Sequence, residues 1–217
     1  FDAVNVTSDA VKLTASFTAS HHIRLRGGSV KNAGDGVLRG DDLEQGILVT
    51  NGADSNEFIG VEVAYNGEAS NRDHGFYIAT DDNLVDGCHV HHNAAVGVQI
   101  VDVGADGDPD RNVVRNSDIH DNGQAGPTGE GITVCGADNR IERNYSHDNQ
   151  AAGILVYDVD GVCDAINTTV RANWLTGNGG EPITVYPTAV GTVESGNFLF
   201  APVQNESGGT GAAGEIP

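Results

Sequence analysis

The sequence has 217 residues, of which 30 are glycine and none is methionine. Its 31 acidic and 11 basic residues give a formal net charge of -20, which disfavours nucleic acids and other polyanions as partners because like charges repel at long range. No stretch approaches the roughly 18 consecutive apolar residues of a membrane span. These features predict a single domain without a membrane span.

Residues 1–34 contain short apolar segments at irregular spacing. Residues 25–34 (LRGGSVKNAG) repeat the frame of residues 114–123 (VRNSDIHDNG). We therefore expect one or two irregular structural units at this end. Because the chain starts at Phe1 and contains no methionine, we also expect it to be a processed or trimmed form.

From residue 46 onward a short apolar segment recurs, usually opened by glycine. These opening segments begin at Gly46, Gly75, Gly97, Gly131, Gly153 and Pro182, at spacings of 29, 22, 34, 22 and 29 residues. Each is followed by two further short apolar segments, and the unit closes with an asparagine. Three short strands per unit, with no helical period between them, predict a solenoid with a base period of about 22 residues and insertions that form loops.

The pattern GIxV, then NxIxxN, then xIHxN resembles the right-handed parallel β-helix superfamily, which includes pectate lyases, alginate lyases and mannuronan C5-epimerases. The resemblance implies an all-β, single-stranded right-handed parallel β-helix of about eight coils over residues 1–203. Residues 204–217 form a Gly-rich tail that we expect to be flexible. No capping helix is visible at the amino end, so a removed segment, a partner or a polar turn would have to cover that edge.

Side chains alternate along a strand, so one residue of each opening segment should point outward. This predicts an outer column of Leu48, Tyr77, Gln99, Thr133, Leu155 and Thr184. Insertions at 66–73 and 123–130 lie on one side of these strands, and acidic loops at 102–111 and 158–164 lie on the other. We expect the cleft between them to be the functional site.

One constellation in this region has the residue types needed for a lyase or a C5-epimerase acting on a uronic acid. It consists of Arg72, Asp73, His74, Tyr77 and Gln99. Such reactions need a base, an acid and a group that neutralises the carboxylate, and His74, Tyr77 and either Arg72 or Gln99 would fill these roles. A His and Tyr pair resembles the one in alginate lyases and epimerases, although the order RDHGFY differs from the epimerase motif. The alternative is a turn histidine and an exposed sheet tyrosine, since strict alternation separates the two residues unless the chain bends at Gly75.

Other residues beside the opening segments predict contacts with a sugar. Tyr157 and Tyr186, one coil apart, would form a stacking surface, and Glu130 and Glu181 lie at the rim. A glycoside hydrolase would need two carboxylates ~5 to 9 Å apart, supplied by Glu130 with Asp73 or Glu181, or by Asp81 with Asp82. The outer columns contain no carboxylate, which places hydrolysis third.

Two acidic loops predict calcium binding. Asp106, Asp108 and Asp110 alternate as in oxygen-ligand loops, and Asp158 and Asp160 repeat half of that pattern. No glutamate follows at the distance of an EF-hand. The alternative is that both loops are acidic, solvated turns.

The three cysteines have different expected roles. Cys135 and Cys163 fall in neighbouring coils, so a disulfide between them is geometrically plausible and would indicate an oxidising compartment. Cys88 falls at a buried corner and is expected to be a core thiol.

Three histidines align in the third segments of neighbouring units. The column reads Lys31, Ala64, His91, His120, His147 and Thr176, with His92, Asp121 and Asp148 beside it. Stacked imidazoles suit a transition metal, but a solvent-facing polar ladder explains the same pattern and is the interpretation we favour from the sequence.

Taken together, the sequence predicts a secreted, monomeric β-helix that binds a polysaccharide as a lyase or C5-epimerase. A non-catalytic carbohydrate-binding or adhesin rod is the main alternative, since this scaffold hosts many functions.

Overall fold

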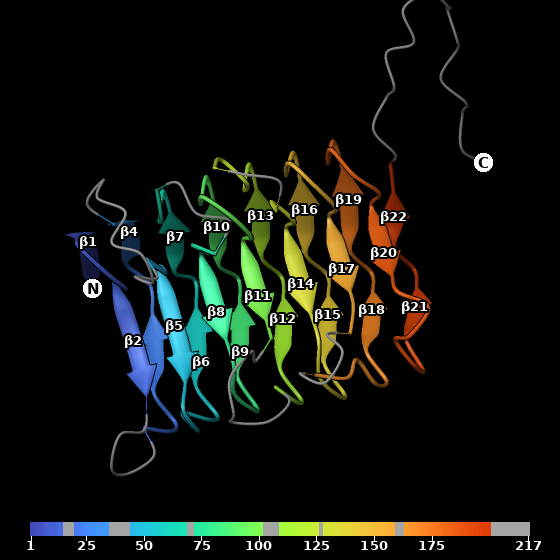
Figure 1. Ribbon diagram of the computed structural model, residues 1–217, viewed down its shortest axis with the longest axis horizontal. Coiled ribbons are helices and arrows are strands. Elements are labelled where there is room, and N and C mark those ends of the chain that lie inside the picture. The colour runs from blue at the N-terminus through green and yellow to red at the C-terminus, as the bar shows by residue number, and fades with distance from the viewer. Residues whose placement is uncertain are drawn as a thin grey trace, which may run out of the picture.

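The computed structural model describes residues 1–14, 20–34, 44–68, 72–101, 109–125, 128–158 and 163–200. Within them the chain winds as a parallel β-helix, with three strands in most coils and each strand paired to its counterpart in the next coil (Figure 1). Strands β1 and β22 lie at opposite ends of the rod. No helical segment in the described parts of the chain has the length and hydropathy needed to cross a membrane.

Three parallel sheets form the walls of the rod. The opening sheet contains β2 (Val11–Thr14), β5 (Ile47–Thr50), β8 (Phe76–Ile78), β11 (Val98–Ile100), β14 (Ile132–Val134), β17 (Ile154–Val156) and β20 (Ile183–Val185). The second sheet contains β3 (Arg24–Arg26), β6 (Glu57–Ile59), β9 (Leu84–Asp86), β12 (Val113–Arg115), β15 (Arg140–Glu142), β18 (Thr169–Arg171) and β21 (Val193–Ser195). The third sheet contains β1 (Asp2–Val6), β4 (Ser29–Ala33), β7 (Glu62–Ala64), β10 (His89–His91), β13 (Asp118–His120), β16 (Tyr145–His147), β19 (Trp174–Thr176) and β22 (Phe198–Leu199).

The repeat length differs from the predicted base period. The closing asparagines Asn66 and Asn93 are separated by 27 residues, and Asn93 and Asn122 by 29 residues. The same two separations follow in the next two coils. A separation of 22 residues occurs beside the opening sheet where no loop intervenes, as between the hydrogen-bonded His74 and Val96. The predicted base period was therefore too short, because most coils carry an extended corner.

The amino end is more regular than predicted. Its strands pair in register with the coils that follow, with Asp2 opposite Ser29 and Val11 opposite Ile47. The irregular spacing of the sequence reflects long connections between strands that are themselves ordinary.

The core is a stack of inward-facing aliphatic and aromatic side chains. Phe58 and Val85 of the second sheet, Val90 of the third sheet, and Ile78 and Ile100 of the opening sheet are 0 or 1% exposed. Burying each such side chain stabilises the fold by roughly 1.5 to 3 kcal/mol. The glycine that opens each unit is explained by close packing, since a Cβ at Gly75 would lie 2.6 Å from the carbonyl oxygen of Gly97.

The closing asparagines form a buried hydrogen-bonded ladder between the third and opening sheets. The side-chain Oδ1 of Asn122 accepts hydrogen bonds from the backbone N–H and the Nδ2 of Asn93, at 3.2 and 2.9 Å. The same pairing continues through Asn66, Asn149 and Asn178. Similar ladders occupy the other two corners, and the buried Cys88 begins one of them by donating its backbone N–H to Ser117 Oγ.

Candidate functional site

The outer face of the opening sheet has the predicted column. Leu48, Tyr77, Gln99, Thr133, Leu155 and Thr184 are paired in that order. The column is not fully open to solvent, because Leu48 and Thr133 are only 6 and 3% exposed. Val101 and Cys135, just after β11 and β14, are fully buried. Part of this outward face is therefore covered.

A disulfide explains some of that coverage. Cys135, which follows β14, is bonded to Cys163, and their Cα atoms lie 6.0 Å apart. The two half-cystines and Val101 form a small apolar cluster outside the main core, against which Tyr77 and Tyr157 pack. Cys163 is thus held against the middle of the opening sheet, where two phenol side chains pack on the same cluster.

His74 and Tyr77 are neighbours, although strict alternation would separate them. Their ring centroids are 5.8 Å apart, because the chain turns at Gly75 before β8 begins. The predicted pair therefore comes together where β8 begins, at the amino-terminal ends of the opening-sheet strands.

The contacts of His74 count against the predicted role as a base, which stays a prediction. The side chain is 3% exposed, and its Nδ1 accepts a hydrogen bond from the backbone N–H of Val96 at 3.1 Å. Burial, with a smaller effect from the charge of Arg72, lowers the pKa of His74 to about 3. The neutral ring therefore carries its hydrogen on Nε2 and is equipped to donate a hydrogen bond.

Neighbouring members of the predicted constellation hold the corner before β8. Asp73 is 1% exposed and accepts a hydrogen bond from the backbone N–H of Glu44 at 3.2 Å. Gln45 donates its side-chain amide to the backbone oxygen of Arg72 at 2.6 Å. Gln99 is half-buried between Tyr77 and Thr133 on adjacent strands. Arg72 itself lies in an exposed turn.

The tyrosines predicted to stack on sugar are arranged edge to face. The rings of Tyr157 and Tyr186 are 6.2 Å apart at an interplanar angle of 73°. Burial, together with the phenol of Tyr77 and the charge of Glu130, raises the pKa of Tyr157 to about 12, so this phenol is protonated at neutral pH. Tyr186 is 45% exposed, so the pair presents one accessible ring instead of a flat platform.

The contacts of the predicted carboxylates give little support for a catalytic pair of the kind that a glycoside hydrolase needs. Glu130 is half-buried and Glu181 exposed, and their backbone oxygens accept hydrogen bonds from the opening glycines of neighbouring coils, as the rim position predicted. Asp81 and Asp82 both pair with Arg111, at 2.7 and 2.9 Å.

The calcium prediction lies partly outside the described residues, which do not include Asp106, Asp108 and Asp160. Asp110 accepts a hydrogen bond from the backbone N–H of Ala137, and Asp158 accepts one from that of Ala165, each at 2.7 Å. Both of these carboxylates fix loop backbone, and calcium binding stays a prediction.

Seven of the 11 basic residues lie on or next to the second sheet, away from the predicted cleft. There the buried carboxylate of Glu142 pairs with Arg140, Arg143 and Arg171 at 2.6, 3.2 and 3.1 Å. Burial alone would raise the pKa of Glu142, but hydrogen bonds from Arg171 and Arg140 outweigh it, and the pKa lies below its ordinary value. These cations therefore neutralise the protein's own carboxylate.

An exposed aromatic row on the third sheet was missed by the sequence analysis. Tyr145, Trp174 and Phe198 are paired on β16, β19 and β22 and are 41, 48 and 57% exposed. The Trp174 ring stacks on Phe198 and on Phe200, with centroids 5.5 Å apart in each case. The signal was present in the sequence, because YSH, WLT and FLF each begin with an aromatic residue at the same position of the repeat.

A cavity adjoins this aromatic row. Its volume is about 420 Å³, and it is lined by Arg143, Asn144, Tyr145, Ala172 and Trp174. Two aromatic residues and an arginine therefore border one hollow at the corner between the second and third sheets, where the amide of Asn144 is buried in the ladder.

Comparisons with known proteins agree with the fold. A family model described as "Right handed beta helix region" matches residues 23–198. No curated protein shows significant sequence similarity to the chain.

Three solved structures illustrate the structural likeness. Pectate lyase Pel9A is 20% identical with a TM-score of 0.51, over 81% of this chain and 46% of that one. A mutant of the periplasmic alginate epimerase AlgG is 11% identical with a TM-score of 0.60, over 91% and 47%. The A-module of the Azotobacter vinelandii mannuronan C-5 epimerase AlgE4 is 17% identical with a TM-score of 0.56, over 88% and 57%. The chain thus spans about half the length of these proteins, and at such identities the likeness concerns the fold alone.

Proposed function

Because this chain belongs to the right-handed β-helix family, whose sheets present regularly spaced outward side chains, we propose that it binds a polysaccharide along the outer face of the third sheet. The exposed row of Tyr145, Trp174 and Phe198 carries this proposal. Strands in neighbouring coils lie ~4.8 Å apart, so the row is a continuous apolar strip along the rod. An exposed apolar strip of this kind typically marks a binding surface.

The chemistry beside the strip suits a sugar. A pyranose presents apolar C–H faces and a rim of hydroxyl groups, and ligand sites commonly combine aromatic walls with a few polar groups. Tyr145 and Trp174 offer aromatic surface in the cavity. The guanidinium of Arg143, 47% exposed beside its contacts with Glu142 and Asn116, has further N–H groups that can donate to hydroxyl or carboxylate oxygens.

The side chains of this strip point away from the outer face of the sheet and not along the axis of the rod. Outer-face side chains stand roughly perpendicular to their sheet. A further coil stacked beyond β22 would cover the edge of that strand, but it would not cover Tyr145, two strands inside. The exposure of Tyr145 is therefore a property of the face.

A second candidate is a lyase or C5-epimerase centred on the opening sheet. The 5.8 Å contact between His74 and Tyr77 favours it, as does the likeness to proteins named as a pectate lyase and as mannuronan or alginate epimerases. Tyr77 and the protonated Tyr157 would act as proton donors, and Gln99 or Arg72 would bind the substrate carboxylate. The base would come from Glu130, whose charge acts on Tyr157, because the Nδ1 of His74 is occupied by the N–H of Val96. The Cys135–Cys163 disulfide is consistent with an oxidising compartment, and we propose that the protein is secreted.

Affinity electrophoresis and calorimetry against alginate, pectate, glucuronan and a neutral β-glucan test the binding proposal. Trp174→Ala should weaken binding about tenfold or more, because truncating a central tryptophan of an interface costs roughly 2 kcal/mol. Tyr186→Ala, an exposed tyrosine on the opening sheet, is the matched control and should bind like the wild type. Binding to none of these polymers, or equal losses in both variants, would reject the third-sheet strip.

The enzymatic candidate has its own readout. Ultraviolet absorbance of unsaturated uronides detects elimination, and proton NMR of the recovered polymer detects epimerisation. Activity that is lost in Tyr77→Phe and kept in Trp174→Ala would establish the opening sheet as a catalytic site. A flat trace and unchanged polymer on every uronate would remove this candidate for those substrates.

A further inference from the structure

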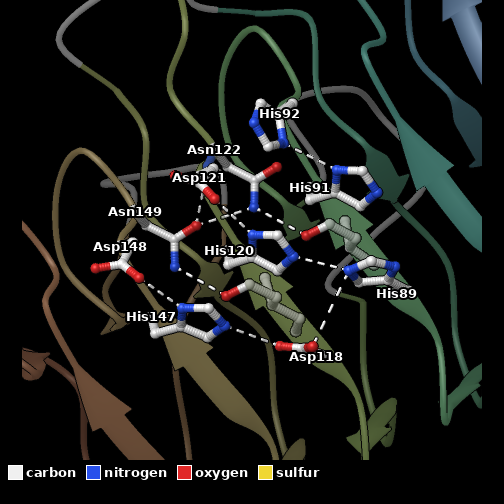
Figure 2. A network of polar contacts seen from close by, with 12 residues as sticks. His89, His91, His92, Asp118, His120, Asp121, Asn122, His147, Asp148 and Asn149 are labelled. Atoms are coloured by element: carbon white, nitrogen blue, oxygen red, sulfur yellow. Dashed lines mark hydrogen bonds and ion pairs between the residues drawn. The ribbon is translucent and has the colours of Figure 1, made fainter.

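Five histidines and three aspartates gather on the outer face of the third sheet, in the middle of the rod (Figure 2). Glu62, on the neighbouring strand β7, adds a fourth carboxylate. The set consists of His89, His91, His92, His120, His147, Glu62, Asp118, Asp121 and Asp148. From this set we propose that His89, Asp118 and His120 bind one divalent transition-metal ion of the Zn²⁺ type. The proposed ligands lie on the same face as the aromatic strip, with Asp118 paired with Tyr145, but none of them belongs to that strip.

The three side chains converge because of strand register. His89 on β10 is directly opposite Asp118 on β13, and His120 lies two residues further along β13 on the same face. The Nε2 atoms of His89 and His120 are 2.7 Å apart, and Asp118 Oδ2 lies 4.0 Å from His89 Nε2. One ligand atom from each residue lies within 4.8 Å of the other two. Metal–nitrogen bonds of ~2.0 to 2.1 Å place neighbouring ligand atoms ~3 Å apart, so a small outward movement of the imidazoles would admit the ion.

The partner of His120 fixes which ring nitrogen faces the site. Its Nδ1 lies 2.7 Å from Asp121 Oδ2, and a carboxylate accepts hydrogen bonds, so the hydrogen of His120 is on Nδ1. The Nε2 lone pair therefore points at His89, whose own Nε2–H donates to it. A carboxylate behind a histidine is the usual support of a metal-bound imidazole. On metal binding the hydrogen of His89 would move from Nε2 to Nδ1, with no net release of a proton.

Asp118 is oriented by a second contact. Its Oδ1 lies 3.1 Å from His147 Nε2, and His147 Nδ1 lies 2.8 Å from Asp148 Oδ2. This leaves Asp118 Oδ2 on the side of His89 (Figure 2). The stacked rings of His91 and His147 on either side of His120, at 5.0 and 4.7 Å, restrict how far that ring can tilt.

The ligand set selects the class of ion. Calcium and magnesium take oxygen ligands, whereas two imidazoles and one carboxylate suit Zn²⁺ and its neighbours. The side chains of His89 and Asp118 are 45 and 47% exposed, so solvent can complete the coordination. A purely solvated polar ladder would not require two ring nitrogens to face each other with a carboxylate behind one of them.

Isothermal titration of the full chain with ZnCl₂, and the visible spectrum of the Co²⁺ form, test the site. We expect one ion per chain, with an affinity that excess calcium does not reduce. Asp121→Asn should lower the affinity about tenfold, since supporting carboxylates typically contribute 10- to 100-fold. His120→Ala and the nearly isosteric Asp118→Asn should lower it further, and circular dichroism should show that each variant is folded.

His21→Ala is the matched control, because His21 and His22 form an exposed pair with their Nδ1 atoms 2.6 Å apart and lie outside the proposed ligand set. It should bind Zn²⁺ as the wild type does. Unchanged affinity in Asp118→Asn and His120→Ala, or a loss that appears equally in His21→Ala, would overturn the proposal. Binding of Ca²⁺ in preference to Zn²⁺ would also overturn it.

Discussion

The buried polar residues of this protein are stabilised by partners in adjacent coils. Asn93, Asn122 and Asn149 lie between hydrophobic side chains, yet each amide contacts the next one and a backbone group. An unpaired buried amide would be costly, so each asparagine depends on the coil on either side of it. The ladder therefore couples stability along the rod at the level of single residues.

Replacing one asparagine in the middle of the ladder should destabilise the whole molecule. In Asn122→Ala the backbone N–H and amide of Asn93 lose their acceptor, and the carbonyl of Val90 loses a donor. Because each buried group left unpaired costs ~1 to 3 kcal/mol, we expect the free energy of unfolding to fall by at least about 2 kcal/mol in urea titrations. Asn197→Ala, at the last rung of another ladder, should cost clearly less, and equal losses would contradict the argument.

Glu142 should contribute an acid-sensitive part of the stability. Its pKa is lowered from the ordinary value of 4.5, so the unfolded state binds a proton more readily than the folded state. The contribution is then fully present above pH 4.5 and is lost as the pH falls through the lower pKa of the folded state. We expect the difference in unfolding free energy between wild type and Glu142→Gln to shrink as the pH falls below 4.5. Glu57→Gln, which removes an exposed pair with Arg24, should show a much smaller difference at neutral pH; a pH-independent difference for Glu142→Gln would reject the role.

At the level of elements, the register of the strands was predictable from the sequence. Which outward-facing side chains are buried was not. Alternation and the opening glycine predict the order Leu48, Tyr77, Gln99 down the opening sheet, because both depend on spacing alone. That Cys135 is buried on the outward face depends on Cys163 and on tyrosines from other coils, which no local pattern encodes. The aromatic row could have been found by aligning the third segments. The stacking of Trp174 on Phe200 could not.

The disulfide should stabilise the attachment of Cys163 to the opening sheet. Cys135 and Cys163 are 28 residues apart, and closing a loop of that size restricts the unfolded chain by roughly 3 to 4 kcal/mol. We expect the double variant Cys135→Ser and Cys163→Ser to keep the circular dichroism of a β-helix while losing up to that free energy of unfolding. The Tyr157 phenol should then titrate nearer its ordinary value, as followed by ultraviolet absorbance. An unchanged free energy of unfolding and an unchanged titration of Tyr157 would contradict this role of the disulfide.

On the scale of the whole molecule, charge is unevenly distributed. Most of the 11 basic residues lie on or next to the second sheet, where they pair with carboxylates, as Arg111, Arg115 and Arg140 do. The excess of acidic groups that gives the net charge of -20 therefore falls mainly on the rest of the surface. Such an excess repels itself in a compact rod more than in an extended unfolded chain.

Salt should therefore stabilise the folded rod in the range where screening changes most. The screening length falls from ~30 Å at 0.01 M to ~8 Å at 0.15 M ionic strength, which shortens the reach of repulsion from several coils to about two. We expect the unfolding temperature, measured by circular dichroism, to rise steadily with NaCl over that range and more slowly above it. Sucrose at matched osmolality controls for general solvent effects and should not reproduce the steep part. An unfolding temperature that stays flat between 0.01 and 0.15 M would mean that local pairing already cancels the repulsion, and the acidic surface would then have to be explained by a bound cation or by the habitat of the protein.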